Sequence, residues 1–169
     1  MELFEAIHNR RSIRVYEDKD VPEELVENIL KAGMAAPSAG NQQPWEYIVL
    51  TEREILDKVP EINEYAQMAK EAHLAILVCG DTGREKFAGY WVVDCSAAVQ
   101  NMLLAAHALG LGAVWTGICP MKDRIQGFKK LLDLPEKVMP HSLVILGYPA
   151  REIEPEDRYN PAWVHYNGW

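Results

Sequence analysis

Hydrophobic residues recur at helical spacing in several stretches of the chain. Over residues 22–35, Leu25, Ile29 and Leu30 repeat with the period of a helix. Residues 92–109 are apolar almost all round, which is typical of a helix at the centre of a fold. The pattern predicts further helical segments over Glu2–Asn9, Glu54–Glu71 and Met121–Leu132.

Short apolar runs between these segments predict four β-strands. Each is rich in the β-branched and aromatic residues that favour extended structure. Leu74–Val78 is apolar throughout, so we expect this strand to be buried on both faces. The other predicted strands are Tyr47–Leu50, Ala113–Thr116 and Leu143–Leu146.

Length and composition fit one globular unit. The chain has 169 residues, which is enough for a single domain over residues 1–169 with a substantial core. A formal net charge of −8 and a pI near 5.1 disfavour a nucleic-acid-binding surface, which would need a broad basic face. No stretch approaches the ~20 apolar residues that cross a bilayer.

The N-terminus and the cysteines both indicate a cytoplasmic protein. Residues 1–5 lack the basic region and apolar run of a secretory signal. The three cysteines are an odd number, widely spaced and set in apolar sequence, which predicts buried free thiols and no disulfide framework.

The last twenty residues differ from the rest. Residues 150–169 are polar at first and then contain four aromatic side chains that cannot form a core of their own. We therefore expect this tail to pack across another surface, such as that of a second subunit. The aromatics are Tyr159, Trp163, Tyr166 and Trp169.

Two polar segments interrupt the apolar pattern. Residues 10–14 place three arginines around one serine in an acidic chain, which favours a local site for a small phosphorylated ligand. Taken alone, these arginines could equally pair with surface carboxylates. Residues 37–45 form a glycine-containing polar turn between two apolar stretches.

These segments, in this order and spacing, resemble the short form of the FMN-dependent nitroreductase family over nearly the whole chain. The resemblance implies an α+β fold of three layers, with helices flanking a mainly antiparallel central sheet, and an intertwined homodimer with tightly bound FMN at its interface. The matching pieces are Arg10–Arg14, Pro37–Trp45, Asp94–Asn101, Gly110–Gly117 and Gly147–Pro149.

The resemblance assigns one group of residues to the phosphate end of FMN. Arg10 and Ser12 correspond to phosphate ligands, and Arg11 and Ile13 line the same stretch of the cofactor through side chain or backbone. A late basic residue completes the site; it corresponds best to Arg158, with Arg151 as the alternative.

A second group corresponds to residues around the flavin ring. Arg14 would stabilise the negative charge that develops on the ring's pyrimidine edge. Thr116 and Gly117 correspond to backbone donors near N5 and O4.

The turn over residues 37–45 resembles the segment that reaches FMN from the partner subunit. Asn41 and Gln43 offer amides that match the ring's donors and acceptors. Many relatives have a second serine where Ala39 stands, which removes one hydroxyl donor here. The corresponding residues of the segment are Pro37, Ser38 and Ala39.

By this resemblance the chain is an NAD(P)H-dependent oxidoreductase. NADH or NADPH would pass hydride to FMN N5, and an electron-poor acceptor such as a nitroaromatic, a quinone or a flavin would take it in a ping-pong cycle. Because FMN performs the chemistry, no protein residue is expected to act as an indispensable acid or base. Alternatives are a flavin-binding electron carrier and a flavin-fragmenting or reductive dehalogenase relative.

Other chemistries have weaker support. The five histidines show no pair at metal-ligand spacing, so a metal site is not expected. The glycines between 110 and 117 follow a helix and precede a strand, the reverse of a dinucleotide-binding loop, and we interpret them as a helix stop and a close backbone approach. Tyr90 and Trp91 either shape the pocket above the flavin or belong to the core.

Overall fold

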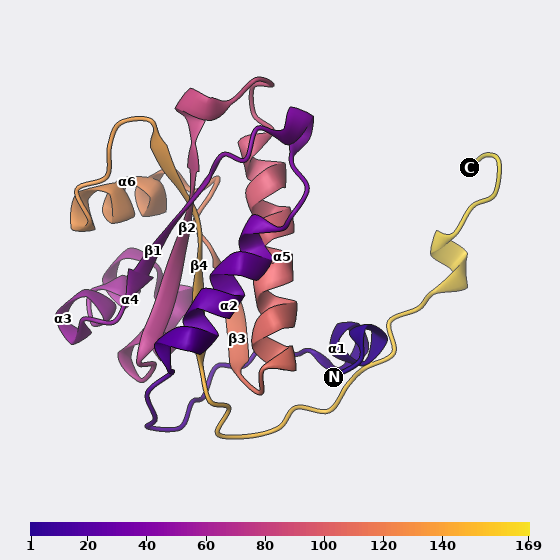
Figure 1. The fold of residues 1–169 in the computed structure, drawn as a ribbon, viewed down its shortest axis with the longest axis horizontal. Helices are drawn as coiled ribbons and strands as arrows, with labels where there is room; N and C mark the ends of the chain where they lie inside the picture. Colours follow the sequence, from indigo (N-terminus) through magenta and orange to yellow (C-terminus); the bar gives the residue numbers. More distant parts are fainter.

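The computed structural model describes residues 1–169, with helices packed on both faces of one sheet (Figure 1). The longer helices are α1 (Leu3–Asn9), α2 (Glu23–Met34), α5 (Trp91–Ala108) and α6 (Lys122–Leu131). The strands are β1 (Trp45–Leu50), β2 (Leu74–Asp81), β3 (Gly112–Gly117) and β4 (Val138–Gly147). Short helical turns are α3 (Arg53–Leu56), α4 (Val59–Ile62), η1 (Ala39–Asn41), η2 (Glu64–Lys70), η3 (Thr82–Arg84) and η4 (Pro161–Trp163).

The sheet has the strand order β1-β2-β4-β3, and every neighbouring pair is antiparallel. The central strands β2 and β4 are buried along almost their whole length, as expected for an apolar run covered on both faces. All four predicted strands are confirmed. Because Trp45 pairs with Gly80 and Gly117 with Ser142, these residues lie toward one end of the sheet.

Two hydrophobic clusters fill the space on either side of the sheet. One joins the inward faces of α2 and α5 to alternate strand residues such as Ile76 and Val144. The other joins α3, α4, η2 and α6 to the opposite faces of the same strands, through Leu77 and Ile145. Consecutive strand residues therefore enter different clusters, as the pleat requires. The α+β class, the three layers and the antiparallel sheet are confirmed.

Helix α5 is the central helix that the apolar run predicted. Eight of its 18 residues are buried, and it contacts α2 and all the strands of the sheet. Its C-cap is Leu109, and Gly110 follows with a φ of 79°, a left-handed conformation that glycine adopts without strain. The interpretation of Gly110 as a helix stop is confirmed.

Two predicted helices differ from the structure. Residues 54–71 form no continuous helix but three short pieces, α3, α4 and η2. Pro60 lies in the first turn of α4, and Asn63 is extended and accepts a bond from the Tyr65 N–H, so a new turn starts there. Pro22 is the N-cap of α2 and not its first helical residue.

The segment after α1 docks on the outer edge of β3. Ser12 forms a parallel bridge with Ala113, and the Ile13 N–H donates to the Ala113 carbonyl at 3.1 Å. Ile13 lies directly over Gly112, where an added Cβ would come within 2.7 Å of the isoleucine side chain. The expected close approach is thus located at Gly112, where only a glycine leaves room.

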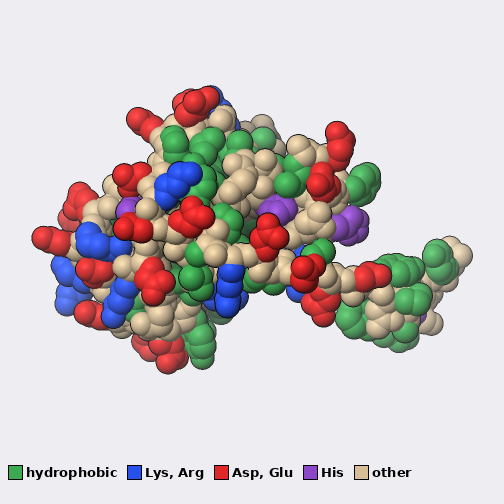
Figure 2. All heavy atoms as spheres, turned by 90° about the horizontal axis from the view of Figure 1, so that it is seen from below, with side chains coloured by type: hydrophobic (Ala, Val, Ile, Leu, Met, Phe, Trp, Pro, Cys, Tyr) green, Lys and Arg blue, Asp and Glu red, His purple; other side chains and the backbone are tan.

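The tail leaves the body and extends past α1, and η4 is its one helical turn (Figure 1). Space-filling Figure 2 shows its hydrophobic side chains gathered on a protruding arm. All four tail aromatics are exposed, Tyr159 at 73% and Trp169 completely. Within one chain the tail covers no core.

The helices and the cysteines agree with what the sequence predicts about membrane spans and disulfides. None of the helices combines the length and the apolar character needed to traverse a bilayer. Cys79 and Cys95 are buried free thiols and Cys119 is half-buried. Burial raises the pKa of Cys79 to about 12, so this thiol stays protonated and unreactive at neutral pH.

Because of the close contact at Gly112, this end of β3 has no room for an added side chain, whereas the other end, at Gly117, has room for one. We expect Gly112→Ala to destabilise the protein by about 1–3 kcal/mol, because the new methyl group must displace the Ile13 side chain. Gly117→Ala is the matched control, since no atom lies within 4 Å of its added Cβ. Urea denaturation of both variants measures the difference, and equal stabilities would contradict this account of the docking.

Candidate functional site

A buried carboxylate organises the polar turn over residues 37–45. Asp94, in the first turn of α5, is only 3% exposed. Its Oδ1 accepts the Ala39 N–H at 2.9 Å and its Oδ2 accepts Gln42 Nε2 at 2.6 Å. Each carboxylate oxygen thus has a donor from the turn, and the helix N-terminus further favours the negative charge. Asp94 lies in a matching piece of the sequence, but its bonding depends on tertiary structure.

Gln42 extends this network to the segment before α5. It is buried, and its Oε1 accepts the backbone N–H groups of Lys86 and Phe87 at 2.8 and 3.4 Å. The Lys86 ammonium in turn donates to the Gly40 carbonyl at 3.0 Å. The turn is therefore held from two sides by charge-assisted or buried hydrogen bonds. Sequence reasoning passed over Gln42 in favour of its exposed neighbours.

The backbone of the turn has an unusual conformation. Gly40, Asn41 and Gln43 all have positive φ, between 46° and 55°. The Gln43 N–H donates to Ser38 Oγ at 3.0 Å, which closes the turn. The side-chain amides of Asn41 and Gln43 are exposed and make no hydrogen bond within the chain. This geometry directs two free amides outward, as a ligand site requires.

The predicted phosphate residues meet a residue from the far end of the chain. Burial lowers the pKa of Arg10, and the nearby charges of Arg11 and Arg158 lower it further. Burial also lowers the pKa of His107, as do Arg10 and Arg11. Residues from α1, α5 and the tail therefore converge into one basic cluster. Of the two candidates for a late basic residue, Arg158 is the one whose charge acts on Arg10.

Arg11 has a different environment from its neighbours. Its guanidinium donates to four backbone carbonyls, those of His8, Arg10, Glu154 and Glu156, at 2.7 to 3.3 Å. Arg14 is exposed, and its one contact is a long 3.5 Å bond to the Ser12 carbonyl. The two arginines thus differ in how many donors remain for a ligand.

The end of β3 presents backbone and not side-chain groups. The Thr116 hydroxyl is buried and donates to the Leu143 carbonyl at 2.9 Å. The Gly117 carbonyl accepts Arg124 Nη1 at 2.9 Å and Asn63 Nδ2 at 3.3 Å, which fixes this peptide. The Thr116 side chain is therefore committed to the fold, in agreement with a role through the main chain alone.

A buried histidine supports the same end of the sheet. His141 contacts Ser96 and Ser142 through its two ring nitrogens at 3.1 and 3.0 Å. Burial lowers the pKa of His141 to about 4, so the ring is neutral at physiological pH. Its backbone carbonyl accepts the N–H groups of Ile118 and Cys119. This residue was not among the sequence candidates.

Tyr90 and Trp91 have different environments, so the choice between pocket and core has a different answer for each residue. Trp91 is a core residue: it is 9% exposed, covers Gly80 and lies edge-on to His141. Tyr90 is 52% exposed and packs edge-on against the exposed Phe87. Tyr90 thus remains available to line a pocket, whereas Trp91 does not.

One chain does not bring all the predicted residues together. Ser12 and Ile13 pair near Gly112, whereas the polar turn precedes Trp45, and these lie at opposite ends of the sheet. Asp94 and His107 mark the same separation along α5, because 13 residues of helix span about 20 Å. The turn and the arginine cluster of one chain therefore do not form one local site.

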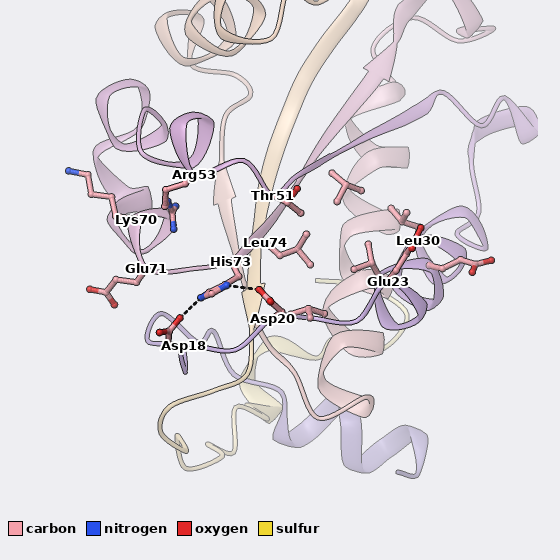
Figure 3. A pocket seen from close by; sticks show the side chains of 14 residues that line it. Asp18, Asp20, Glu23, Leu30, Thr51, Arg53, Lys70, Glu71, His73 and Leu74 are labelled. Atoms are coloured by element: carbon pink, nitrogen blue, oxygen red, sulfur yellow. Dashed lines mark hydrogen bonds and ion pairs between the residues drawn. The ribbon is translucent and has the colours of Figure 1, made fainter.

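A large cavity lies elsewhere in the chain. It measures about 1020 Å³ and is lined by α2, the end of β1 and the start of β2, with none of the predicted site residues. Figure 3 shows His73 between Asp18 and Asp20 at its rim. The ring nitrogens of His73 contact one carboxylate each, at 2.6 and 2.8 Å. Hydrogen bonds to Asp20 and Asp18 raise the pKa of His73.

The chain matches a protein-family model over most of its length. The model of the Nitroreductase family matches residues 7–77 and 63–148, two overlapping segments. They include the arginine segment, the polar turn, α5 and the whole sheet.

Individual relatives are similar over the full chain. A protein of Methanothermobacter thermautotrophicus, provisionally named NADH dehydrogenase/NAD(P)H nitroreductase, is 51% identical over all of this chain and 88% of its own. A crystal structure of a protein with the same provisional name from Parabacteroides distasonis has a TM-score of 0.96 at 46% identity, covering 99% and 98% of the two chains. A provisionally named nitroreductase of Desulfovibrio desulfuricans in complex with FMN has a TM-score of 0.85 at 33% identity, covering 99% and 97%.

The Asp94 network generates a first prediction for the site. Asp94→Asn replaces one acceptor with a donor, so either the Ala39 N–H or the Gln42 amide loses its buried partner. We expect a loss of stability of about 1–3 kcal/mol and faster hydrogen exchange at residues 38–43. Asp123→Asn, an exposed acid at the start of α6, is the control. Unchanged exchange in the turn would contradict the role given to Asp94.

The histidine at the large cavity generates a pH prediction. Because the folded pKa of His73 is raised, its clamp stabilises the protein fully below the unfolded histidine pKa of about 6.5 and loses that effect as the pH rises through the folded pKa. We expect NMR titration to give a folded pKa above 6.5 and His73→Gln to be less stable than the wild type only on the acidic side. A stability difference that grows with pH would have the wrong sign for this clamp.

Proposed function

Because the chain belongs to the nitroreductase family, we propose that it is an FMN-dependent oxidoreductase that takes hydride from NADH or NADPH and passes it to an electron-poor acceptor. Nitroaromatics, quinones and flavins are acceptors of this kind, and one site serves donor and acceptor in turn. The basic cluster around Arg10 is the observation that carries the proposal, together with the FMN bound by the Desulfovibrio relative.

The basic cluster fits the phosphate of FMN. Arg10 and Arg158 interact although the chain carries a net charge of −8: burial lowers the pKa of Arg10, and repulsion from Arg11 and Arg158 lowers it further. A dianionic phosphate would remove that repulsion and accept paired hydrogen bonds from the guanidinium groups. The Ser12 hydroxyl makes no hydrogen bond within the chain and is available as a further donor.

The polar turn fits the flavin ring. Its outward amides, at Asn41 and Gln43, can each donate and accept, as the edge of an isoalloxazine requires. The Asp94 network holds the turn in place before a ligand arrives, so less conformational entropy is lost on binding. Pro37, Ser38 and Ala39 belong to the same rigid turn.

The separation of these groups supports a homodimer. Since the turn and the arginine segment lie at opposite ends of one chain, we propose that the turn of each protomer completes the site of its partner. Residues 1–169 would act as one domain, with the exposed aromatics of residues 150–169 packing on the partner subunit. The free thiols agree with a cytoplasmic location.

The residues of this chain would bind and orient, while bound FMN would supply the transfer of hydride between the two substrates. Arg14, whose donors are nearly all free, is suited to stabilise negative charge on the ring. The Gly117 N–H would be available to the ring. Asn63 and Arg124 both donate to the Gly117 carbonyl and so fix this residue. Arg11 and Ile13 support the phosphate end. We assign no general acid or base.

A spectrum of the purified protein tests the proposal directly. We expect flavin absorption in the visible range and its bleaching when NADH or NADPH is added, followed by recovery with a nitroaromatic or quinone acceptor. Retention of flavin without turnover of either nicotinamide would instead indicate an electron carrier. A colourless protein that fails to bind added FMN would refute the proposal.

The phosphate assignment generates a quantitative prediction. Charge-assisted hydrogen bonds are worth about 1.5–3 kcal/mol each, so Arg10→Ala combined with Ser12→Ala should weaken FMN binding at least tenfold. Fluorescence titration with FMN measures the dissociation constant. Lys130→Ala, which removes an exposed charge on α6, should leave it unchanged. Full FMN affinity in the double variant would count against these ligands.

A further inference from the structure

We propose that Arg11 is a positioning residue, which clamps the tail at residues 154–156 so that Arg158 stands beside Arg10 at the phosphate site. The inference rests on the proposed function for its ligand. It gives Arg11 a role distinct from the neighbouring arginine, although both belong to the same five-residue segment.

The side chains of this segment point in alternating directions. Ser12 bridges to Ala113 and the Ile13 N–H bonds to the Ala113 carbonyl, so the segment around them runs alongside β3 as a strand would. In an extended segment consecutive side chains point to opposite sides, so Arg11 shares a side with Ile13 and opposes Arg10 and Ser12. Arg11 and Ile13 indeed line the same cavity of about 410 Å³, and neither Arg10 nor Ser12 does.

The donors of the Arg11 guanidinium are all directed at backbone carbonyls. Arg11 Nε donates to the Glu154 carbonyl at 3.2 Å and Nη2 to the Glu156 carbonyl at 3.3 Å. Nη1 donates to two carbonyls of its own segment at 2.7 and 2.9 Å. One guanidinium thus joins the exit of α1 to a segment more than 140 residues later, and its planar fork suits several carbonyls at once.

The tail follows the N-terminal segment before it reaches Arg11. The Glu17 N–H donates to the Tyr148 carbonyl and the Ala150 N–H to the Val15 carbonyl, so the tail first runs antiparallel to the N-terminal segment. Beyond Ala150, the next hydrogen bonds between the tail and the body are those donated by Arg11. Glu156 is two residues from Arg158, and two residues of chain reach at most about 7 Å. Fixing the Glu156 carbonyl therefore restricts where Arg158 can lie.

Arg158 needs such a restraint. It is exposed, and its other contacts are two long 3.4 Å bonds to the nearby Glu156 carboxylate. Yet its charge reaches Arg10, a neighbour that repels it. The clamp holds two like charges together so that an arriving phosphate meets both, and the cost of ordering the tail is met before binding.

A double-mutant cycle on the full chain tests the proposal. We expect Arg11→Gln and Arg158→Gln each to weaken FMN binding about tenfold or more, and the double variant to be no weaker than Arg158→Gln alone, because Arg11 acts through Arg158. Lys130→Gln, which removes an exposed charge on α6, is the charge-matched control and should bind FMN normally. Independent, multiplying losses from Arg11 and Arg158 would show direct contact with the phosphate and overturn the proposal.

Two further measurements separate the clamp from the ligand. Arg11→Gln should speed hydrogen exchange at residues 150–158 in the protein without added FMN, a result that does not depend on the proposed cofactor. Arg11→Lys keeps the charge but lacks the fork, so it should not restore slow exchange or FMN affinity. Riboflavin, which has no phosphate, should bind the wild type and Arg11→Gln equally. Unchanged hydrogen exchange in the tail, or full rescue by lysine, would overturn the proposed role of Arg11. Failure of the wild type to bind FMN would instead overturn the proposed function alone.

Discussion

The candidate site depends on the hydrogen bonds of the Asp94 side chain, which is buried at the start of α5. A carboxylate with almost no exposure is stable only if its oxygens are hydrogen-bonded, and both partners come from the polar turn. The requirement is mutual: the turn has three residues with positive φ and needs an anchor. The helix that forms the core of one layer thereby also fixes the ring side of the site.

The opposite end of the site is built on the edge of β3. Docking of residues 12 and 13 on this edge needs a glycine at position 112, and the extended conformation that results sorts the arginines onto two sides. Arg11 on one side holds the tail, and Arg10 and Ser12 on the other side remain available for the proposed ligand. A single local conformation thus divides five adjacent residues between binding and support. The two ends of the site lie too far apart within one chain, which is why a homodimer is part of the proposed function.

The predictions from sequence succeeded where one strong pattern dominated. The apolar run of α5, the glycine after it and the four strands follow from period and propensity, and the structure confirms them. The prediction of one continuous helix over residues 54–71 was wrong. The hydrophobic spacing there is helical, but Pro60 and the buried Asn63 interrupt the helical hydrogen bonding. Gln42 and His141 were missed because a polar residue amid apolar sequence reveals no partner until distant segments pack together.

The amino-acid sequence by itself determined the order of elements, the buried strands and the family, because these depend on local periodicity and on motifs that can be read in one dimension. It also supplied the arginine and amide candidates for the phosphate and ring contacts, whereas His107 entered the cluster only through the structure. Only the tertiary structure decided what each candidate does, since hydrogen bonds between residues 11 and 156, or 42 and 94, link positions with no relation along the chain. Arg10 and Arg11 are identical in chemistry and adjacent in sequence, and they differ solely in the direction that an extended backbone gives their side chains.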